Sequence, residues 1–413
     1  MTLVAMSGRQ IDAQENTAAV DHAKRIFDAL QHEQFDEVTK EFNAQMSAAL
    51  TADGLRGIWT SFHQQVGAFQ SFLDQRASAR PQGMTAVVLG CQFEKAAVNL
   101  ILAFDADNKI AGLHFTPRPA VATEPARPTS TKFTEEQVTV GTGDWTLPGT
   151  LSMPVGRIIA AVVLVHGSGP GDRDETIGPN KPFRDLAWGL ADRGIAVLRY
   201  EKRTKQYGPK MASVTNLTVK EEAIDDALAA AALLRKHDRI DPKRIVVLGH
   251  SLGGTLAPRI AAEDHALAGI IIMAGATRPL LDVVRDQVTY LASLNPSAGA
   301  STDVEKAVAS IRSRAPESYW KDFDAYNPAQ TAAKLTLPML ILQGERDYQV
   351  SMQDLQGWRD ALRGHSNATI KTYPTLNHLF QAGEGKSKPS EYDHEGHMPD
   401  IVLDDIAAWA AKL

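Results

Sequence analysis

Cysteine is nearly absent from this chain, because Cys91 is the only one in 413 residues. A single cysteine excludes an internal disulfide and any metal site built from several thiolates. Long apolar runs are also lacking. No segment has the roughly 20 consecutive apolar residues that a membrane-spanning helix requires. The sequence therefore gives no sign of a disulfide scaffold, a thiolate metal cluster or a membrane span.

An excess of basic residues is missing as well. Lys and Arg number 43 against 49 Asp and Glu, and the formal net charge of −6 argues against nucleic acid as a partner. Residues 1–7 have neither the basic start nor the long apolar core of a signal peptide. We therefore expect a cytoplasmic protein as the sequence stands, and a periplasmic or secreted one if a leader has been removed.

The first part of the chain is organised as helices followed by strands. Residues 17–69 contain three helical patterns with apolar side chains spaced three and four apart. The strand-like runs that follow are 70–79, 84–93, 95–105 and 109–115. This order predicts a small α+β domain over residues 1–118. Four prolines within 116–129 and the lack of apolar periodicity predict a stiff linker, which we place at 119–135.

Residues 136–413 instead alternate strands with helices. The predicted strands lie at 158–165, 195–200, 244–249, 268–274, 337–343 and 368–373, after an opening hairpin at 137–140 and 145–152. This alternation predicts the α/β class, with a mostly parallel, doubly wound sheet. Between 278 and 335 the alternation stops, which indicates a helical cap inserted above the sheet edge. Within it, Trp320 and Tyr326 are candidate substrate contacts, and packing of the cap onto the sheet is the alternative.

One motif indicates a catalytic residue because of its position between a strand and a helix. Gly249-His250-Ser251-Leu252-Gly253 follows a β-branched strand and leads at once into a small-residue helix. A G-x-S-x-G sequence in that context is typical of a nucleophile elbow, a tight turn that exposes the serine hydroxyl above the sheet. Ser251 is therefore the candidate nucleophile. His250 is expected to pack under the turn, without a chemical role.

An acid and a base follow the next two suitable strands. Asp347 comes after the run 337–343, and His378 comes after the run 368–373. Catalytic groups of open α/β sheets gather at the carboxyl ends of the strands, so both should lie at the same edge as Ser251. The chain order Ser, Asp, His is that of the α/β-hydrolases. Glu345 is the rival acid, although it lies nearer its strand.

A glycine-rich loop follows the apolar run 158–165. Its sequence is His166-Gly-Ser-Gly-Pro-Gly171, and a loop at this position supplies one backbone N–H of an oxyanion hole. The other N–H comes from the residue after the nucleophile, Leu252. We choose Ser168 as the loop donor and leave Gly167 and Gly169 open.

Taken together, these stretches make residues 136–413 resemble an α/β-hydrolase-fold serine esterase. The branch is the bacterial one related to dienelactone hydrolases and to serine aminopeptidases of the S33 type. The stretches that carry the resemblance are 166–174, 178–185, 199–204, 249–254, 344–350 and 377–380. One group in this branch has an additional N-terminal domain, and residues 1–118 are similar to a cystatin-like or nuclear-transport-factor-like domain.

The resemblance implies a carboxylesterase that cleaves small acyl esters through an acyl-enzyme. Its expected partner is a small-molecule ester, with no metal or organic cofactor, and a homodimer is left open. An aminopeptidase or an acyl thioesterase could use the same groups. A binding protein that kept the fold and lost turnover is the second alternative, although no member of the Ser, His, Asp set is missing.

Two further charged stretches have ordinary interpretations. His394 and His397 have no second ligand cluster, so a polar loop is favoured over a metal site. The charges at 172–174 could bind a charged substrate, and a salt-bridged loop is the safer interpretation.

Overall fold

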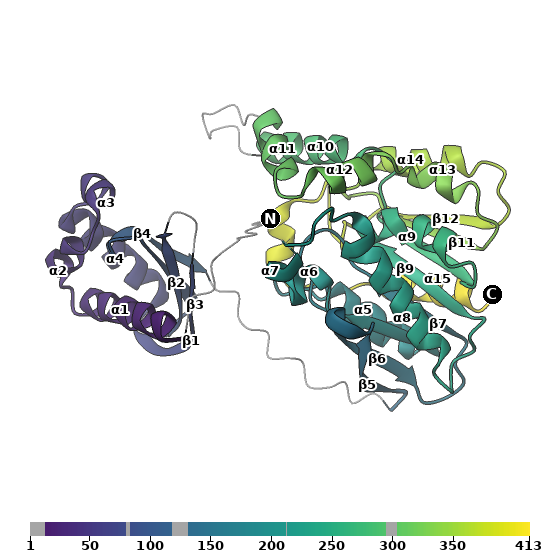
Figure 1. Ribbon diagram of the computed structural model, residues 1–413, viewed down its shortest axis with the longest axis horizontal. Helices are drawn as coiled ribbons and strands as arrows, with labels where there is room; N and C mark the ends of the chain where they lie inside the picture. Colours follow the sequence, from purple (N-terminus) through teal and green to yellow (C-terminus); the bar gives the residue numbers. More distant parts are fainter. Residues whose placement is uncertain (1–12, 80–82, 118–130, 212, 295–303) are drawn as a thin grey trace. The chain divides into compact units, whose positions relative to one another are not determined.

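Two separate sheets define two compact units, Met1–Arg127 and Pro128–Leu413, in a computed structural model of the chain. The structure describes residues 13–79, 83–117, 131–211, 213–294 and 304–413 (Figure 1). Residues 119–130 of the predicted linker lie outside the described residues. Its last residues do not belong to a linker, because strand β5 begins at Phe133, which is buried and pairs with Pro154.

The first unit packs helices against an antiparallel sheet. Strands β1 (Phe69–Ala79), β2 (Thr85–Phe93), β3 (Ala97–Phe104) and β4 (Ile110–Pro117) pair in chain order. Between residues 13 and 66 there are four helices rather than three, namely α1 (Ala13–Gln31), α2 (Phe35–Lys40), α3 (Ala44–Ala49) and α4 (Ala52–Val66). Helices α2 and α3 have only six residues each, so neither is long enough for a periodic pattern to be recognised.

The second unit contains an eight-stranded sheet in the order β12-β11-β10-β9-β7-β8-β6-β5. Strands β12 to β8 are parallel, and β6 and β5 run antiparallel at one edge. Their bounds are β5 Phe133–Val140, β6 Leu147–Pro154, β7 Ala160–Val165, β8 Ile195–Tyr200, β9 Ile245–His250, β10 Gly269–Met273, β11 Met339–Gly344 and β12 Ala368–Tyr373. The predicted α/β class, a mostly parallel sheet preceded by a small α+β domain, is confirmed.

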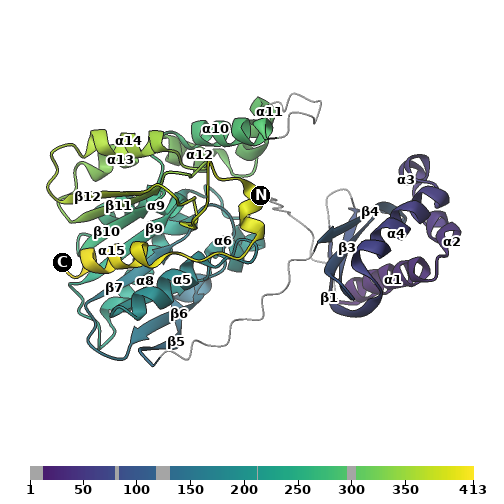
Figure 2. The ribbon, with the colours of Figure 1, turned by 180° about the vertical axis from the view of Figure 1, so that it is seen from behind.

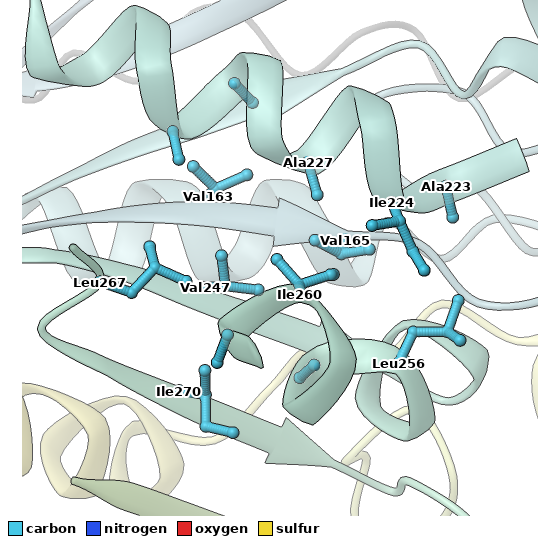
Figure 3. Close-up of a cluster of buried hydrophobic side chains, with 14 of the residues drawn as sticks. Val163, Val165, Ala223, Ile224, Ala227, Val247, Leu256, Ile260, Leu267 and Ile270 are labelled. Atoms are coloured by element: carbon cyan, nitrogen blue, oxygen red, sulfur yellow. The ribbon is translucent and has the colours of Figure 1, made fainter. Parts of the chain in front are cut away.

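Helices cover both faces of this sheet. Helices α5 (Pro182–Ala191) and α15 (Asp400–Ala410) pack on one face, and α8 (Asp225–Arg235) and α9 (Leu252–Glu263) pack on the other (Figures 1 and 2). Successive side chains of a strand point to opposite faces. Accordingly Val163 and Val165 of β7 join the core under α8 and α9 (Figure 3), whereas Val162 joins the core under α5 and α15. Burial on both faces explains the unbroken apolar runs.

Short helical segments fill the connections between these elements. They are a 3-10 turn (Gly143–Trp145), α6 (Arg203–Gln206), α7 (Gly208–Met211), a π-helical turn (Lys220–Ile224), α14 (Met352–Ala361) and a second 3-10 turn (Pro389–Asp393). Within the described residues, no helix combines the length and the apolar character that crossing a bilayer would take.

The stretch predicted as a cap is helical. It contains α10 (Leu280–Ser293), α11 (Val304–Arg312), α12 (Glu317–Asp324) and α13 (Pro328–Ala332). Two polar contacts tie it to α9. Arg259 pairs with Asp322 at 3.0 Å, and the Tyr326 hydroxyl donates to the carbonyl of Thr255 at 2.8 Å. Helices α12 and α13 of this stretch therefore pack close to α9, the helix that follows Ser251.

Helix α9 approaches the end of β7 more closely than any side chain would permit. A Cβ added to Gly253 would overlap the backbone oxygens of Val165 and His166. A Cβ added to Gly249 would overlap the backbone of Gly253 itself. Both glycines of the motif are therefore required by backbone contact, which fixes the direction in which α9 leaves the turn.

We expect Gly253→Ala to destabilise the second unit, by about 3 kcal/mol, because the new methyl group must push α9 away from β7. Gly156→Ala is the matched control, since a Cβ there meets no atom within 4 Å. Its effect should stay within about 0.5 kcal/mol. Thermal unfolding of both variants measures the difference, and equal stabilities would show that the contact at Gly253 is not a constraint.

Candidate active site

Ser251 holds a backbone conformation that L-residues rarely adopt. Its φ is 55° and its ψ is −115°, and its N–H donates to the carbonyl of Met273 at 2.9 Å. Such strain persists only where the surrounding structure enforces it, and it is common at functional sites. The contact with β10 and the close packing at Gly253 provide that enforcement. Ser251 remains partly exposed, as a nucleophile must be.

The predicted acid and base are in contact. Nδ1 of His378 lies 2.6 Å from Oδ2 of Asp347, and both side chains are buried. The other carboxylate oxygen accepts the backbone N–H groups of Gln349 and Val350 at 2.7 and 3.0 Å. Asp347 is thereby held in one orientation. Glu345, the rival acid, is exposed to solvent.

His378 also reaches the nucleophile turn. The ring of His250, next to Ser251 in the chain, lies 4.8 Å from the ring of His378, centroid to centroid. Nε2 of His250 is 2.9 Å from the backbone oxygen of His378. In the part of the chain that the structure describes, Oγ of Ser251 and Nε2 of His378 carry no hydrogen bond. Both atoms are thus available for a reaction.

A second buried acid–histidine pair lies beneath this site. Nδ1 of His250 is 2.8 Å from Oε2 of Glu175, and both residues are almost fully buried. Burial alone would lower the pKa of His250, but the Glu175 carboxylate outweighs it and the pKa is raised. Burial would likewise raise the pKa of Glu175, and the positive charge of His250 lowers it instead. Glu175 has a φ of 53°, so this carboxylate is also placed by a strained backbone.

No role was predicted for Glu175, and His250 was predicted only to pack under the turn. His250 does pack under the turn, as predicted, but it also makes hydrogen bonds on both ring nitrogens. A signal was available for His250, because a histidine in an otherwise apolar buried turn needs polar partners. Nothing in the spacing pointed to Glu175, which is 75 residues away in the chain.

The glycine-rich loop passes directly beside Ser251. A Cβ added to Gly167 would lie 3.1 Å from Cβ of Ser251. The N–H of Gly167 donates to Oε1 of Glu175 at 2.6 Å, so this group is not free to bind a substrate. Ser168 is exposed, and within the described residues its N–H has no hydrogen-bond partner. Of the donors considered from sequence, Ser168 and Gly169 therefore remain.

Two of the three charged residues that follow the loop belong to ion pairs, and the third, Asp172, accepts the backbone N–H groups of Asp174 and Thr176. Arg173 contacts Glu201 at 2.8 Å, and Asp174 contacts Arg199 at 2.8 Å. The interpretation of residues 172–174 as a salt-bridged loop agrees with these contacts. His397 lies 3.2 Å from Asp185, and within the described residues no group of three or more His, Cys, Asp or Glu side chains is arranged to hold a metal.

The polar groups of Trp320 and Tyr326, the two predicted substrate contacts of the cap, form hydrogen bonds within the protein. Trp320 is buried, and its indole N–H donates to the carbonyl of Arg312 at 2.7 Å. The Tyr326 hydroxyl is bound to Thr255, as described above. These contacts favour the packing alternative over substrate contact. A different cap residue approaches the acid, because the Tyr290 ring lies 5.3 Å from the ring of Tyr348, which follows Asp347.

Comparison with known proteins gives two family matches. Residues 183–397 match the prolyl oligopeptidase family. Residues 23–113 match a family described as a protein of unknown function, DUF3887. The second match falls within the first compact unit.

Individual relatives extend these matches. Esterase EstD of Thermotoga maritima is 38% identical over 400 residues, which cover 93% of this chain and 93% of that protein. An uncharacterized peptidase of Bacillus subtilis, YtmA, is 25% identical over 51% of this chain and 75% of its own length. Among solved structures, an esterase of Pyrococcus furiosus is 16% identical over 68% of this chain and 91% of that chain, with a TM-score of 0.45.

The Glu175–His250 pair predicts a pH-dependent stability. Because the pKa of His250 is raised, its contribution is full below the ordinary value of 6.5 and is lost as the pH rises through the folded-state pKa. Because the pKa of Glu175 is lowered, its contribution is present above the ordinary value of 4.5 and is lost as the pH falls. The pair should therefore stabilise the fold most between these two values.

We expect Glu175→Gln to lower the free energy of unfolding by about 3 kcal/mol at pH 5.5, and by less at pH 9. Urea unfolding at both pH values measures this difference. Glu201→Gln is the control, because its partner is an arginine and its effect should not change over this range. A Glu175→Gln effect equal at both pH values would contradict the pair.

Proposed function

Since the chain belongs to the prolyl oligopeptidase family of α/β-hydrolases, we propose that it hydrolyses carboxylic esters of small acyl groups. Ser251 is the nucleophile, His378 the general base and Asp347 the acid that orients it. The backbone N–H groups of Leu252 and Ser168 form the oxyanion hole. The observation that carries the proposal is the 2.6 Å contact between His378 and Asp347, next to a serine in a strained turn.

The family and the class of enzyme agree with the sequence prediction. An α/β-hydrolase of the esterase type was expected, and the family match together with the 38% identity to an esterase over most of the chain confirms it. The roles of the individual residues are our proposal, and so is a chain of two domains joined by a linker that ends before β5 begins at Phe133. A homodimer is also kept as a proposal.

Acylation begins with proton transfer. A serine hydroxyl is a weak nucleophile at neutral pH, so Nε2 of His378 removes its proton as Oγ attacks the ester carbonyl. The resulting imidazolium is stabilised by Asp347, which accepts the hydrogen bond from Nδ1. The carbonyl oxygen becomes an oxyanion and accepts hydrogen bonds from the two backbone N–H groups. His378 then gives its proton to the departing alcohol.

Deacylation repeats these steps with water. His378 removes a proton from the water as it attacks the acyl group on Ser251, and returns that proton to Oγ when the acid leaves. The same two N–H groups bind the second oxyanion. Every step uses side chains and backbone groups of this chain alone.

Ester cleavage is favoured over the alternatives by the relative that covers most of the chain, which is an esterase by name. Peptide hydrolysis is the second candidate. It is supported by the family described as prolyl oligopeptidase and by a shorter relative named as a peptidase. The catalytic groups would be the same, so substrates must decide between them.

We expect a fluorophosphonate probe to label the wild-type protein and not the Ser251→Ala variant, because only the activated hydroxyl displaces fluoride. Mass spectrometry should place the label on the peptide that contains Ser251. Ser168→Ala is the matched control, since its backbone N–H is kept and labelling should persist. An unlabelled wild-type protein would favour a binding role without turnover.

A panel of substrates distinguishes ester from amide and thioester cleavage. We expect p-nitrophenyl esters with short acyl chains to give the highest kcat/KM, above aminoacyl p-nitroanilides and acyl-CoA. A higher kcat/KM on an aminoacyl anilide would contradict the esterase proposal and support a peptidase.

We expect Asp347→Asn to lower kcat on the best of these esters by about 10⁴-fold, because the imidazole of His378 loses its orientation and its counter-charge.

A further inference from the structure

Residues that follow strand β8 form hydrogen bonds with alternate backbone carbonyl groups of the glycine-rich loop, residues 166–171. The backbone N–H of Lys202 donates to the carbonyl of Gly171 at 3.0 Å. The Thr204 hydroxyl donates to the carbonyl of Gly169 at 3.4 Å. The Lys202 ammonium donates to the carbonyl of Gly167 at 2.9 Å. The motif at 199–204, which the mechanism above does not use, is thus built around the loop.

The topology explains why this segment meets the loop. Strand β7 lies between β9 and β8, and the three are parallel. Their carboxyl ends therefore meet at one edge of the sheet. Ser251 follows β9, the glycine-rich loop follows β7 and Lys202 follows β8, so the loop lies between the nucleophile and the lysine.

Lys202 is an unusual residue for this place. It is 2% exposed, and its ammonium is shared between Oε1 of Glu222 at 2.6 Å and the Gly167 carbonyl. Burying a lysine is unfavourable unless its charge is paired and its N–H groups are hydrogen-bonded. Glu222 pairs the charge but accepts only one of the three ammonium N–H groups. The carbonyl of Gly167 is a second acceptor, so the lysine and the loop hold each other in place.

That contact fixes the direction of the neighbouring N–H. The carbonyl of Gly167 and the N–H of Ser168 belong to one peptide unit, which is planar and trans, so the two groups point in opposite directions. While the carbonyl is held by Lys202, the N–H must point away from the lysine. The Gly167 N–H is held by Glu175 at 2.6 Å, so the residue is fixed on both sides.

We propose that Lys202 is a positioning residue of the oxyanion hole, which orients the Gly167–Ser168 peptide unit and strengthens its N–H as a donor. The positive charge at the carbonyl polarises the peptide, and hydrogen bonds in such a chain strengthen one another. Lys202 does not touch the substrate. The proposal rests on the function proposed above, and it assigns Ser168 rather than Gly169 as the loop donor.

The test compares two neighbouring buried ion pairs. Lys202→Met/Glu222→Gln removes the contact with the loop without leaving an unpaired charge. Arg203→Met/Asp226→Asn is the matched control, because Arg203 and Asp226 form a buried pair and neither has a hydrogen bond to residues 167–171 in the described structure. Both variants should lower the Tm, which reports any purely structural effect.

For Lys202→Met/Glu222→Gln we expect kcat on a short-chain p-nitrophenyl ester to fall about 10²-fold, the lower end of the loss when one oxyanion donor is removed. KM should change less than about threefold, since the ground-state ester depends little on the donor. Affinity for a trifluoromethyl ketone, whose adduct carries an oxyanion, should fall in parallel with kcat. The control variant should keep kcat within about threefold.

Retention of wild-type kcat by folded Lys202→Met/Glu222→Gln would overturn the proposal. If that variant does not fold, Lys202→Arg keeps the charge opposite Glu222 but moves the donor. It should lose about tenfold in kcat, and unchanged turnover would again overturn the proposal. An inactive wild-type protein would overturn the esterase function and this proposal together, whereas an active wild type with an unaffected variant overturns only the role of Lys202.

Discussion

The backbone contact between helix α9 and the end of strand β7 is the constraint on which the site depends. At Gly253 there is no room for a side chain against the carbonyl groups of Val165 and His166. This packing holds Ser251 in a conformation with φ of 55° and brings the turn within reach of the loop that follows β7. Ser251 and the glycine-rich loop are thus positioned by one contact between two backbones, and the strand ends of a parallel sheet supply the remaining groups of the proposed site.

Buried charged and polar side chains then hold the remaining groups of the site in one orientation. His378 is bound to Asp347 through its ring and to His250 through its carbonyl, so both the imidazole and its peptide are held. Glu175 connects His250 to Gly167 on the other side of the turn. Short hydrogen bonds between buried groups thus connect the imidazole of His378, the turn at His250 and the loop at Gly167. The site is one connected polar network beneath the partly exposed Ser251.

Sequence patterns predicted the parts of this arrangement that depend on local order. The buried parallel strands are short apolar runs, and the predicted run at 195–200 coincides with β8. Ser251, Asp347 and His378 were predicted as site residues because each follows a predicted strand. The start of β5 was missed, since only the two end residues of this strand are buried and its sequence has no apolar pattern.

The supporting residues could not be predicted in the same way. Glu175 and Lys202 act through partners 75 and 35 residues away, and only the folded sheet brings these pairs together. The candidate cap contacts Trp320 and Tyr326 were chosen for their aromatic character alone. Aromatic side chains fill cores as readily as they line pockets, and both have polar contacts within the protein.

The most direct test of the account is a crystal structure of the protein after reaction with a phosphonate ester. The account predicts phosphorus bonded to Oγ of Ser251, with the phosphoryl oxygen about 2.8–3.0 Å from the backbone nitrogens of Leu252 and Ser168. It also predicts that Nε2 of His378 lies within hydrogen-bonding distance of Oγ. A phosphonate on another residue, or an imidazole at 378 turned away from the adduct, would contradict it.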